Sequence, residues 1–149
     1  MDYSFIKFEI IDSVGKISLF RPDILNSFNR PMGKEMQQAL DKCADDKNIR
    51  AVYITGWGRA FCAGQDLAEA ISPETKIADI VRETYNPIIQ KIRTIEKPVV
   101  CAVNGVAAGA GANIAFACDI TFAAESASFI QSFANISLIP DSAGTFFLP

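Results

Sequence analysis

The chain of 149 residues contains no histidine. This absence excludes the usual Ser-His and Cys-His nucleophile pairs and the common zinc sites with imidazole ligands, so no metal site is expected. Lysine and arginine are also few, 14 against 17 aspartates and glutamates, and they form no basic run. We therefore expect no nucleic-acid partner, and any anionic ligand must be held by local groups.

The cysteines stand far apart, and no Cys-x-x-Cys motif is present. Three of them lie among apolar or small residues, which favours buried free thiols in a reducing compartment over a disulfide framework. The N-terminal stretch MDYSFIKFEIID alternates apolar and polar residues, and it lacks the basic-then-apolar plan of a secretory signal. We infer a cytoplasmic protein. The cysteines are Cys43, Cys62, Cys101 and Cys118.

Charge is also absent between Lys97 and Asp119, where a Gly-x-x-x-Gly spacing of the kind that pairs membrane helices occurs. Three features argue against a membrane span. Asn104-Gly105 is a strong turn signal, Asn113 would be a costly polar group in hydrocarbon, and Ala and Gly supply little transfer free energy. No membrane partner is expected.

Half of the residues are hydrophobic, which is typical of a globular chain, and residues 1–149 are expected to form one domain. Apolar residues at strand spacing predict a hairpin over residues 5–20. Apolar residues at helical spacing predict a helix that Asn29 caps and that ends at Asp45-Asp46.

The rest of the chain alternates between short buried strands and helices. Ser72 and Pro73 are expected to open the longest helix, with a kink at Pro87 and a stop at Lys97-Pro98. This alternation predicts an α/β layer structure with crossover connections. The other expected elements are strands over Ala51–Thr55, Val99–Val103 and Asp119–Ala123, and helices over Leu67–Ala70 and Ala110–Ala117.

The stretch VNGVAAGAGANIAFACD, Val103 to Asp119, is almost only Gly and Ala in its middle. A strand that turns through Gly into a helix leaves the first backbone N–H groups of the helix unpaired, with the positive end of the helix dipole behind them. Such groups can bind phosphate, but Asn113-Ile114 stands where a dinucleotide fingerprint needs its third Gly. They can also form an oxyanion hole for a carbonyl oxygen that gains charge. Close helix packing explains the small residues equally well, so packing and oxyanion binding both stay open.

Two other positions could contribute to chemistry. The loop FCAGQDL, Phe61 to Leu67, would expose another backbone N–H near Gln65, although on this pattern alone a surface turn is the simpler interpretation. Asp141 follows Leu-Ile-Pro and precedes Ser-Ala-Gly-Thr, a pattern that favours the N-cap of a helix beginning at Ser142. Partial desolvation between apolar segments could instead raise the pKa of Asp141 and make it a general base.

Taken together, three stretches resemble the crotonase superfamily, also called the enoyl-CoA hydratase/isomerase family. They are TGWGRAFCAGQDL (Thr55–Leu67), KPVVCAVNGVAAGAGANIAFACDI (Lys97–Ile120) and ASFIQSFANISLIPDSAGTFFLP (Ala127–Pro149). The resemblance implies the α/β crotonase (ClpP/crotonase-like) fold, a spiral of β-β-α turns. The sequence reads as cut short at Pro149, so residues 1–149 would be the N-terminal acyl-CoA-binding core without the family's C-terminal helical region. Apolar surface around Phe146–Leu148 is then expected to be exposed.

The resemblance also implies a site. An acyl-CoA thioester would be the substrate, so coenzyme A arrives as part of it and no separate cofactor is expected. The thioester carbonyl would lie between the backbone N–H groups of Gln65 and Ala110. Residues 63–67 would line the path of the CoA adenine and pantetheine. By position, the implied substrate-binding residues are Ala63, Gly64, Gln65, Asp66, Leu67 and Ala110.

The family's branches differ in their acids. Hydratases place one Glu at the position of Asn113 and a second at that of Phe133, and both are missing here. The run AAGAGAN with LIPDSAGTFFLP looks most like the isomerases of aerobic phenylacetate breakdown, which convert ring-1,2-epoxyphenylacetyl-CoA to oxepin-CoA. Relatives shift a 3-enoyl-CoA to a 2-enoyl-CoA, as in fatty acid metabolism. This likeness implies Asp141 as the acid/base, with the cap role held as well.

The resemblance implies a homotrimer or hexamer for the full-length protein. Two alternatives to the isomerase remain: an enoyl-CoA hydratase, which is a lyase, with unusual groups, and a non-catalytic fragment that resembles the family. The sequence alone does not identify the acyl group or the basic residues that would bind the CoA phosphates.

Overall fold

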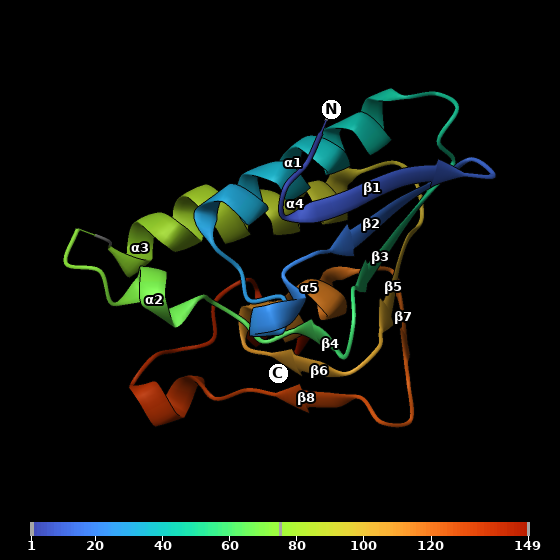
Figure 1. Ribbon diagram of the computed structural model, residues 1–149. Coiled ribbons are helices and arrows are strands. Elements are labelled where there is room, and N and C mark those ends of the chain that lie inside the picture. Colours follow the sequence, from blue (N-terminus) through green and yellow to red (C-terminus); the bar gives the residue numbers. More distant parts are fainter. Residues whose placement is uncertain (1, 75, 149) are drawn as a thin grey trace.

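The computed structural model describes residues 2–74 and 76–148 (Figure 1). Its strands are β1 (Ile6–Ile11), β2 (Val14–Leu19), β3 (Ala51–Gly56), β4 (Ala60–Cys62), β5 (Val99–Val103), β6 (Val106–Ala108), β7 (Ile120–Ala123) and β8 (Ser128–Ile130). Its α-helices are α1 (Arg30–Asp45), α2 (Leu67–Ala70), α3 (Ile77–Ile80), α4 (Asn86–Thr94), α5 (Ala110–Ala117) and α6 (Gly144–Phe147). The 3-10 helices are η1 (Pro22–Ile24) and η3 (Phe133–Ile136), and η2 (Val81–Tyr85) is a π-helix.

The first sheet has the strand order β1-β2-β3-β5-β7. Strands β1 and β2 form the predicted antiparallel hairpin, in which Ile6 pairs with Leu19 and Ile11 with Val14. All later pairs in this sheet are parallel. Helices α1 and α4 lie side by side above this sheet in Figure 1 and contact each other.

The second sheet consists of β4, β6 and β8, all parallel, at the bottom of Figure 1. The chain therefore passes from one sheet to the other in each turn: β3 to β4, β5 to β6, and β7 to β8. Helices α2 and α5 follow the first two of these strand pairs. This repetition confirms the expected α/β spiral of β-β-α turns. The strands of the second sheet were not predicted from hydrophobic patterning.

Helix α1 confirms its sequence-based prediction. The side chain of Asn29 accepts a hydrogen bond from the N–H of Met32 and so caps the helix, and the helix ends at Asp45. Its buried face contains Met36, Leu40 and Cys43, which recur at helical spacing. This face packs against the hairpin of β1 and β2.

The longest helical run does not begin at Ser72-Pro73, as predicted, but at Ile77. It passes through the π-helical turn η2 into α4, which ends at Thr94, before the expected stop at Lys97-Pro98. The π turn ends at Tyr85, two residues before Pro87, where a kink was predicted.

The Gly/Ala run permits close packing, as one of its two interpretations predicts. A Cβ added at Gly111 in α5 would lie 2.7 Å from Cβ, Sγ and the carbonyl oxygen of Cys62, so α5 meets strand β4 at backbone distance. All four cysteines are free and buried, which confirms the expectation of buried free thiols in place of a disulfide framework. Burial raises the pKa of the Cys62 thiol to about 12.

Among residues 2–74 and 76–148, no helix is long and apolar enough to cross a membrane. Several large apolar side chains are nevertheless exposed on β7 and in α6, with Phe122 64% and Phe146 79% exposed. Leu148 is exposed as well. The expected apolar surface around Phe146–Leu148 is therefore present.

Candidate active site

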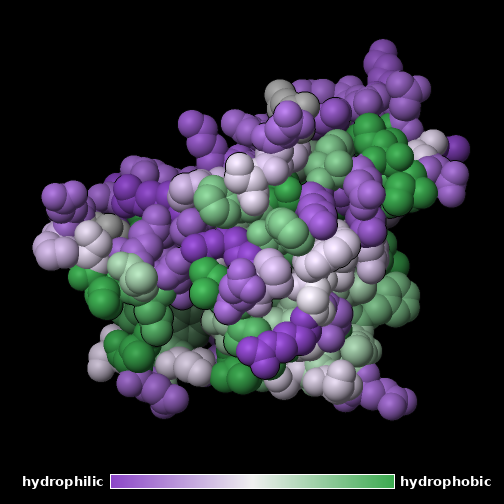
Figure 2. Space-filling model, viewed as in Figure 1, coloured by the Kyte–Doolittle hydropathy of each residue, from purple (hydrophilic) through white to green (hydrophobic). Residues whose placement is uncertain are grey.

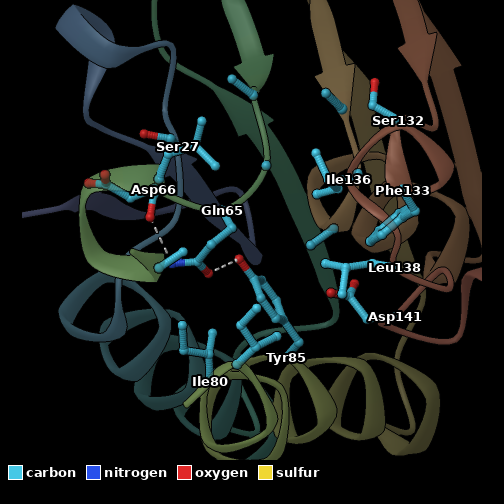
Figure 3. Close-up of a pocket in the computed structure, with 18 of the residues that line it drawn as sticks. Ser27, Gln65, Asp66, Ile80, Tyr85, Ser132, Phe133, Ile136, Leu138 and Asp141 are labelled. Carbon is cyan, nitrogen blue, oxygen red and sulfur yellow. Dashed lines mark hydrogen bonds between the residues drawn. The ribbon is translucent and has the colours of Figure 1, made fainter. Parts of the chain in front are cut away.

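A cavity of about 700 Å³ opens between the loop after β4, the start of α5 and the segment that follows β8 (Figure 3). In Figure 2 hydrophobic residues surround a hollow at the lower left, below α2 and α3. Every residue that the sequence assigned to the site lines this cavity. They are Ala63, Gly64, Gln65, Asp66, Leu67, Ala110 and Asp141.

Parallel pairing of β4 with β6 brings the two predicted loops together. Cys62 pairs with Ala107, so the chain leaves both strands at the same edge of the second sheet. Gly64 has φ +95°, and a Cβ there would lie 3.0 Å from the carbonyl oxygen of Ala108. Only glycine adopts this conformation without strain, and only glycine lets the two loops approach this closely.

The backbone N–H of Gln65 is unpaired. The neighbouring backbone is occupied, because Phe28 N donates to Gly64 O at 2.7 Å and Asp66 N donates to Phe28 O at 2.7 Å. Residues alternate in direction along such a parallel bridge, so the N–H of Gln65 points away from Phe28. Within the described part of the chain it has no hydrogen-bond acceptor.

Ala110 presents a second unpaired N–H, because it is the first residue of α5 and has no preceding turn to bond. Gly109 before it has φ +49° and donates its own N–H to Ile130 O at 2.8 Å. No acceptor for Ala110 N is found among the described residues. The cavity wall therefore offers two free backbone donors, a combination that can bind a carbonyl oxygen as it gains negative charge.

Asp66 lines the cavity, but its carboxylate is already engaged. It forms an ion pair of 2.9 Å with Arg21, whose guanidinium also donates to Ser27 O at 2.6 Å. Its second oxygen accepts from Ala68 N at 3.0 Å and caps α2. Asp66 thus fixes the loop that carries Gln65, and these contacts engage the guanidinium of Arg21.

Asp141 is not a helix N-cap, which corrects the cap role predicted for it. Helix α6 begins at Gly144, and its N-cap is Ala143, with no side-chain hydrogen bond to the helix. Ser142 and Ala143 have φ of +51° and +59°, so a left-handed turn separates Asp141 from the start of the helix. Its carboxylate accepts a hydrogen bond of 2.7 Å from the Ser142 hydroxyl. Figure 3 shows it across the cavity from Gln65.

The Asp141 carboxyl is suited to exchange a proton. Burial raises its pKa above the ordinary value, and the hydrogen bond from Ser142 partly opposes that shift. Among the described residues it has no ion pair with a basic side chain. Within the same ranges, no group of three or more His, Cys, Asp or Glu side chains is placed to hold a metal ion.

Comparison with known proteins agrees with this geometry. A family model described as enoyl-CoA hydratase/isomerase matches residues 9–149. The chain belongs to the enoyl-CoA hydratase/isomerase family. It is 44% identical, over all of its length, to a protein named "Probable enoyl-CoA hydratase" from Rhodobacter capsulatus. It is 43% identical, over 97% of its length, to the 1,2-epoxyphenylacetyl-CoA isomerase of Escherichia coli.

The family's fold is shown equally well by solved structures. The crystal structure of an enoyl-CoA hydratase from Bacillus anthracis matches with a TM-score of 0.91 and 34% identity over 98% of this chain. The chain spans 57% of the length of each of these three proteins. The match therefore covers the N-terminal part of the crotonase fold.

The sequence analysis missed Tyr85, which also lines the cavity. Its buried hydroxyl donates to Gln65 Oε1 at 2.6 Å (Figure 3). Gln65 Nε2 in turn donates to Glu69 Oε2 at 2.9 Å, and Glu69 accepts from the backbone N–H of Arg30. Helical spacing could have found Tyr85, because Val81, Tyr85 and Ile88 follow at intervals of four and three residues.

The remaining wall of the cavity is mostly apolar, which suits the hydrocarbon part of an acyl group. Phe133, at one of the two positions where hydratases are expected to carry Glu, is one of these residues, and it is buried. The apolar residues come from α2, the helical run after Ile77 and the segment after β8. They are Leu67, Ile71, Ile77, Ile80, Val81, Phe133, Ile136 and Leu138.

We expect Tyr85→Phe to reduce the free energy of unfolding by about 1 kcal/mol, because it deletes one buried hydrogen bond and leaves Gln65 Oε1 unpaired. Urea denaturation measures this change. Tyr53→Phe is the matched control, because Tyr53 is half-buried and its hydroxyl has no hydrogen bond among the described residues. Equal effects of the two substitutions would contradict a structural role for the Tyr85 hydroxyl.

We expect Asp141→Asn to stabilise the chain at pH 7. Burial raises the folded-state pKa of Asp141 above its unfolded value, so ionisation at neutral pH costs folding stability. The gain should shrink as the pH falls through the folded pKa and vanish below the unfolded value of about 3.9.

Urea denaturation at several pH values measures this gain. Asp23→Asn, at an exposed aspartate without an ion pair among the described residues, serves as the control. A loss of stability at pH 7 that is specific to Asp141→Asn would contradict the burial of a charged carboxylate.

Proposed function

We propose that the protein is an acyl-CoA isomerase of the enoyl-CoA hydratase/isomerase family. The observation that supports this most is one partly buried carboxylate, Asp141, with no ion pair among the described residues, in an apolar cavity with two backbone donors that have no acceptor there. Asp66 also lines the cavity, but its pairing with Arg21 leaves it unsuited to proton transfer. A single carboxylate is sufficient for a reaction that removes a proton and returns it elsewhere.

In the proposed reaction, the substrate is a 3-enoyl-CoA thioester. The carboxylate of Asp141 takes a proton from the carbon next to the thioester carbonyl. The electron pair of that C–H bond moves into the carbonyl, and the N–H groups of Gln65 and Ala110 bind the resulting enolate oxygen. Asp141 then returns the proton to the far carbon of the former double bond, so the product is a 2-enoyl-CoA and no proton is gained or lost.

The two N–H groups would supply much of the rate enhancement. Removing one donor from an oxyanion hole typically costs about 2.7 to 4 kcal/mol of transition-state stabilisation. Because both donors are backbone groups, small side chains around them allow the thioester to approach. This requirement, together with close packing, explains why the run before Asn113 is almost only Gly and Ala.

The relative from Escherichia coli supports a more specific proposal. Its name, 1,2-epoxyphenylacetyl-CoA isomerase, and its 43% identity suggest that ring-1,2-epoxyphenylacetyl-CoA is a substrate here and that oxepin-CoA is the product. We propose this reaction beside the double-bond shift, in phenylacetate or fatty acid breakdown in the cytoplasm. Residues 63–67 would guide the CoA moiety, and the whole protein would assemble as a trimer or hexamer.

Hydration is the second candidate, because the relative from Rhodobacter capsulatus is named as a hydratase. Adding water to a double bond needs a carboxylate that orients and deprotonates the water. Asn113 and Phe133 cannot take that role, and Asp141 would have to act alone. A non-catalytic protein that only binds or assembles is the third candidate. Calorimetry with an acyl-CoA on this chain tests it, because both enzyme candidates need CoA recognition and a structural role does not.

We expect Asp141→Asn in the whole protein to lower isomerisation of 3-hexenoyl-CoA by at least 100-fold, the lower range for a lost acid/base, while calorimetry shows nearly unchanged affinity. The wild-type rate should fall in acid as Asp141 becomes protonated, with an apparent pKa above the ordinary value for Asp. Retained turnover in the variant would remove Asp141 from the mechanism. Crotonyl-CoA hydration that exceeds isomerisation in the wild type would favour the hydratase instead.

A further inference from the structure

Asn113 is a completely buried polar residue in α5, and both ends of its carboxamide are used. Its Nδ2 donates to the backbone carbonyl of Asp141 at 2.8 Å. Its Oδ1 accepts from Gln131 Nε2 at 2.7 Å, which also determines the direction in which the carboxamide faces. A buried amide that lost either contact would leave an unpaired polar atom, so this orientation is strongly preferred.

The turn that Asn113 holds is one that the backbone does not favour by itself. Ser142 and Ala143 are consecutive non-glycine residues with left-handed φ, and such conformations persist when the surrounding structure enforces them. Gly144 lies directly on the carboxamide, because a Cβ added there would lie 2.5 Å from Asn113 Nδ2. The Asp141 turn is thus held by a hydrogen bond and by close packing against the same side chain.

Helix α5 therefore links the cavity wall to the turn that carries Asp141. Its first residue, Ala110, presents a free N–H, and Asn113 lies three residues later, about 4.5 Å along a rigid axis. We infer that Asn113 is a positioning residue. Because Asn113 and Ala110 lie on the same rigid helix, the contacts of Asn113 with the Asp141 turn fix the position of the Asp141 carboxyl relative to the Ala110 amide. The kinetic consequence of this inference rests on the proposed function, whereas the structural consequence does not.

A purely structural role for Asn113 would make a different prediction. If its contacts only satisfied a buried amide, their loss would lower stability without moving the Asp141 carboxyl. If they set the position of that carboxyl, their loss should alter its exposure and its reactivity as well. Small displacements of a reacting group can cost about 100-fold in rate. A positioning role therefore predicts a clear loss of kcat in the variant, whereas a purely structural role predicts none.

The test uses Asn113→Ala, which removes the hydrogen bond to Asp141, and Gln131→Leu, which removes only the donor that orients Asn113. Thr121→Val is the matched control, because it deletes the 2.7 Å hydrogen bond from Thr121 Oγ1 to Ala115 O in the same helix. The readouts are an NMR titration of the Asp141 carboxyl carbon, the melting temperature, and kcat and KM for 3-hexenoyl-CoA in the whole protein.

We expect the pKa of Asp141 to fall toward its ordinary value in Asn113→Ala, because the released carboxylate gains contact with water. We expect kcat to fall by at least about 10-fold with little change in KM, and by less in Gln131→Leu. Thr121→Val should lower the melting temperature but leave the Asp141 titration and kcat unchanged.

The inference is overturned if Asn113→Ala folds and leaves the Asp141 titration and kcat as in the wild type, whatever its melting temperature. If Asn113→Ala does not fold, Gln131→Leu decides by the same readouts. A wild-type protein without isomerase activity would contradict the proposed function alone, because the titration still reports whether Asn113 positions Asp141.

Discussion

Parallel pairing of β4 with β6 is the constraint on which the site depends. It places the chain at Gly64 within van der Waals distance of the Ala108 carbonyl, so the loop after β4 and the start of α5 share one cavity wall. Each of these segments has a backbone N–H that its own secondary structure cannot satisfy. The topology therefore places two backbone donors, without an acceptor among the described residues, on the wall of one cavity, and no polar side chain is needed to supply them.

The surroundings of the cavity make these donors rigid. The ion pair of Arg21 with Asp66 and the hydrogen bond from Tyr85 to Gln65 hold one loop. On the other side, α5 packs directly on Cys62. Asp141 differs from these groups, because its carboxylate is partly buried and has no ion pair with a basic side chain in residues 2–74 and 76–148. Such a group lowers stability at neutral pH, and its presence is consistent with a role in proton transfer.

Much of the fold could be predicted from the sequence where local signals are strong. The cap at Asn29 follows from side-chain chemistry, and the structure confirms it, as it confirms the bounds predicted for α2 and α5. Strands β4, β6 and β8 escaped prediction because segments of three or so residues have no readable periodicity. Their existence follows from the resemblance to the family, which implies two strands in every turn.

Only some of the site residues and roles were predicted from the sequence. Its backbone donors and Asp141 were assigned by resemblance, and the structure brings them into one cavity. The cap role of Asp141 was wrong, because the left-handed backbone at Ser142 and Ala143 depends on packing against Asn113, a contact between distant parts of the chain. Helical spacing places Tyr85 on the face of Val81 and Ile88, but it does not distinguish a residue of the cavity wall from a residue of the core.

A crystal structure of the whole protein with a bound, unreactive acyl-CoA tests the central claim most directly. The account predicts that the thioester oxygen lies within about 2.7 to 3.1 Å of the backbone nitrogens of both Gln65 and Ala110, with the Asp141 carboxyl against the carbons that exchange a proton. A thioester oxygen bound elsewhere, or an Asp141 carboxyl that points into solvent in the complex, would contradict it.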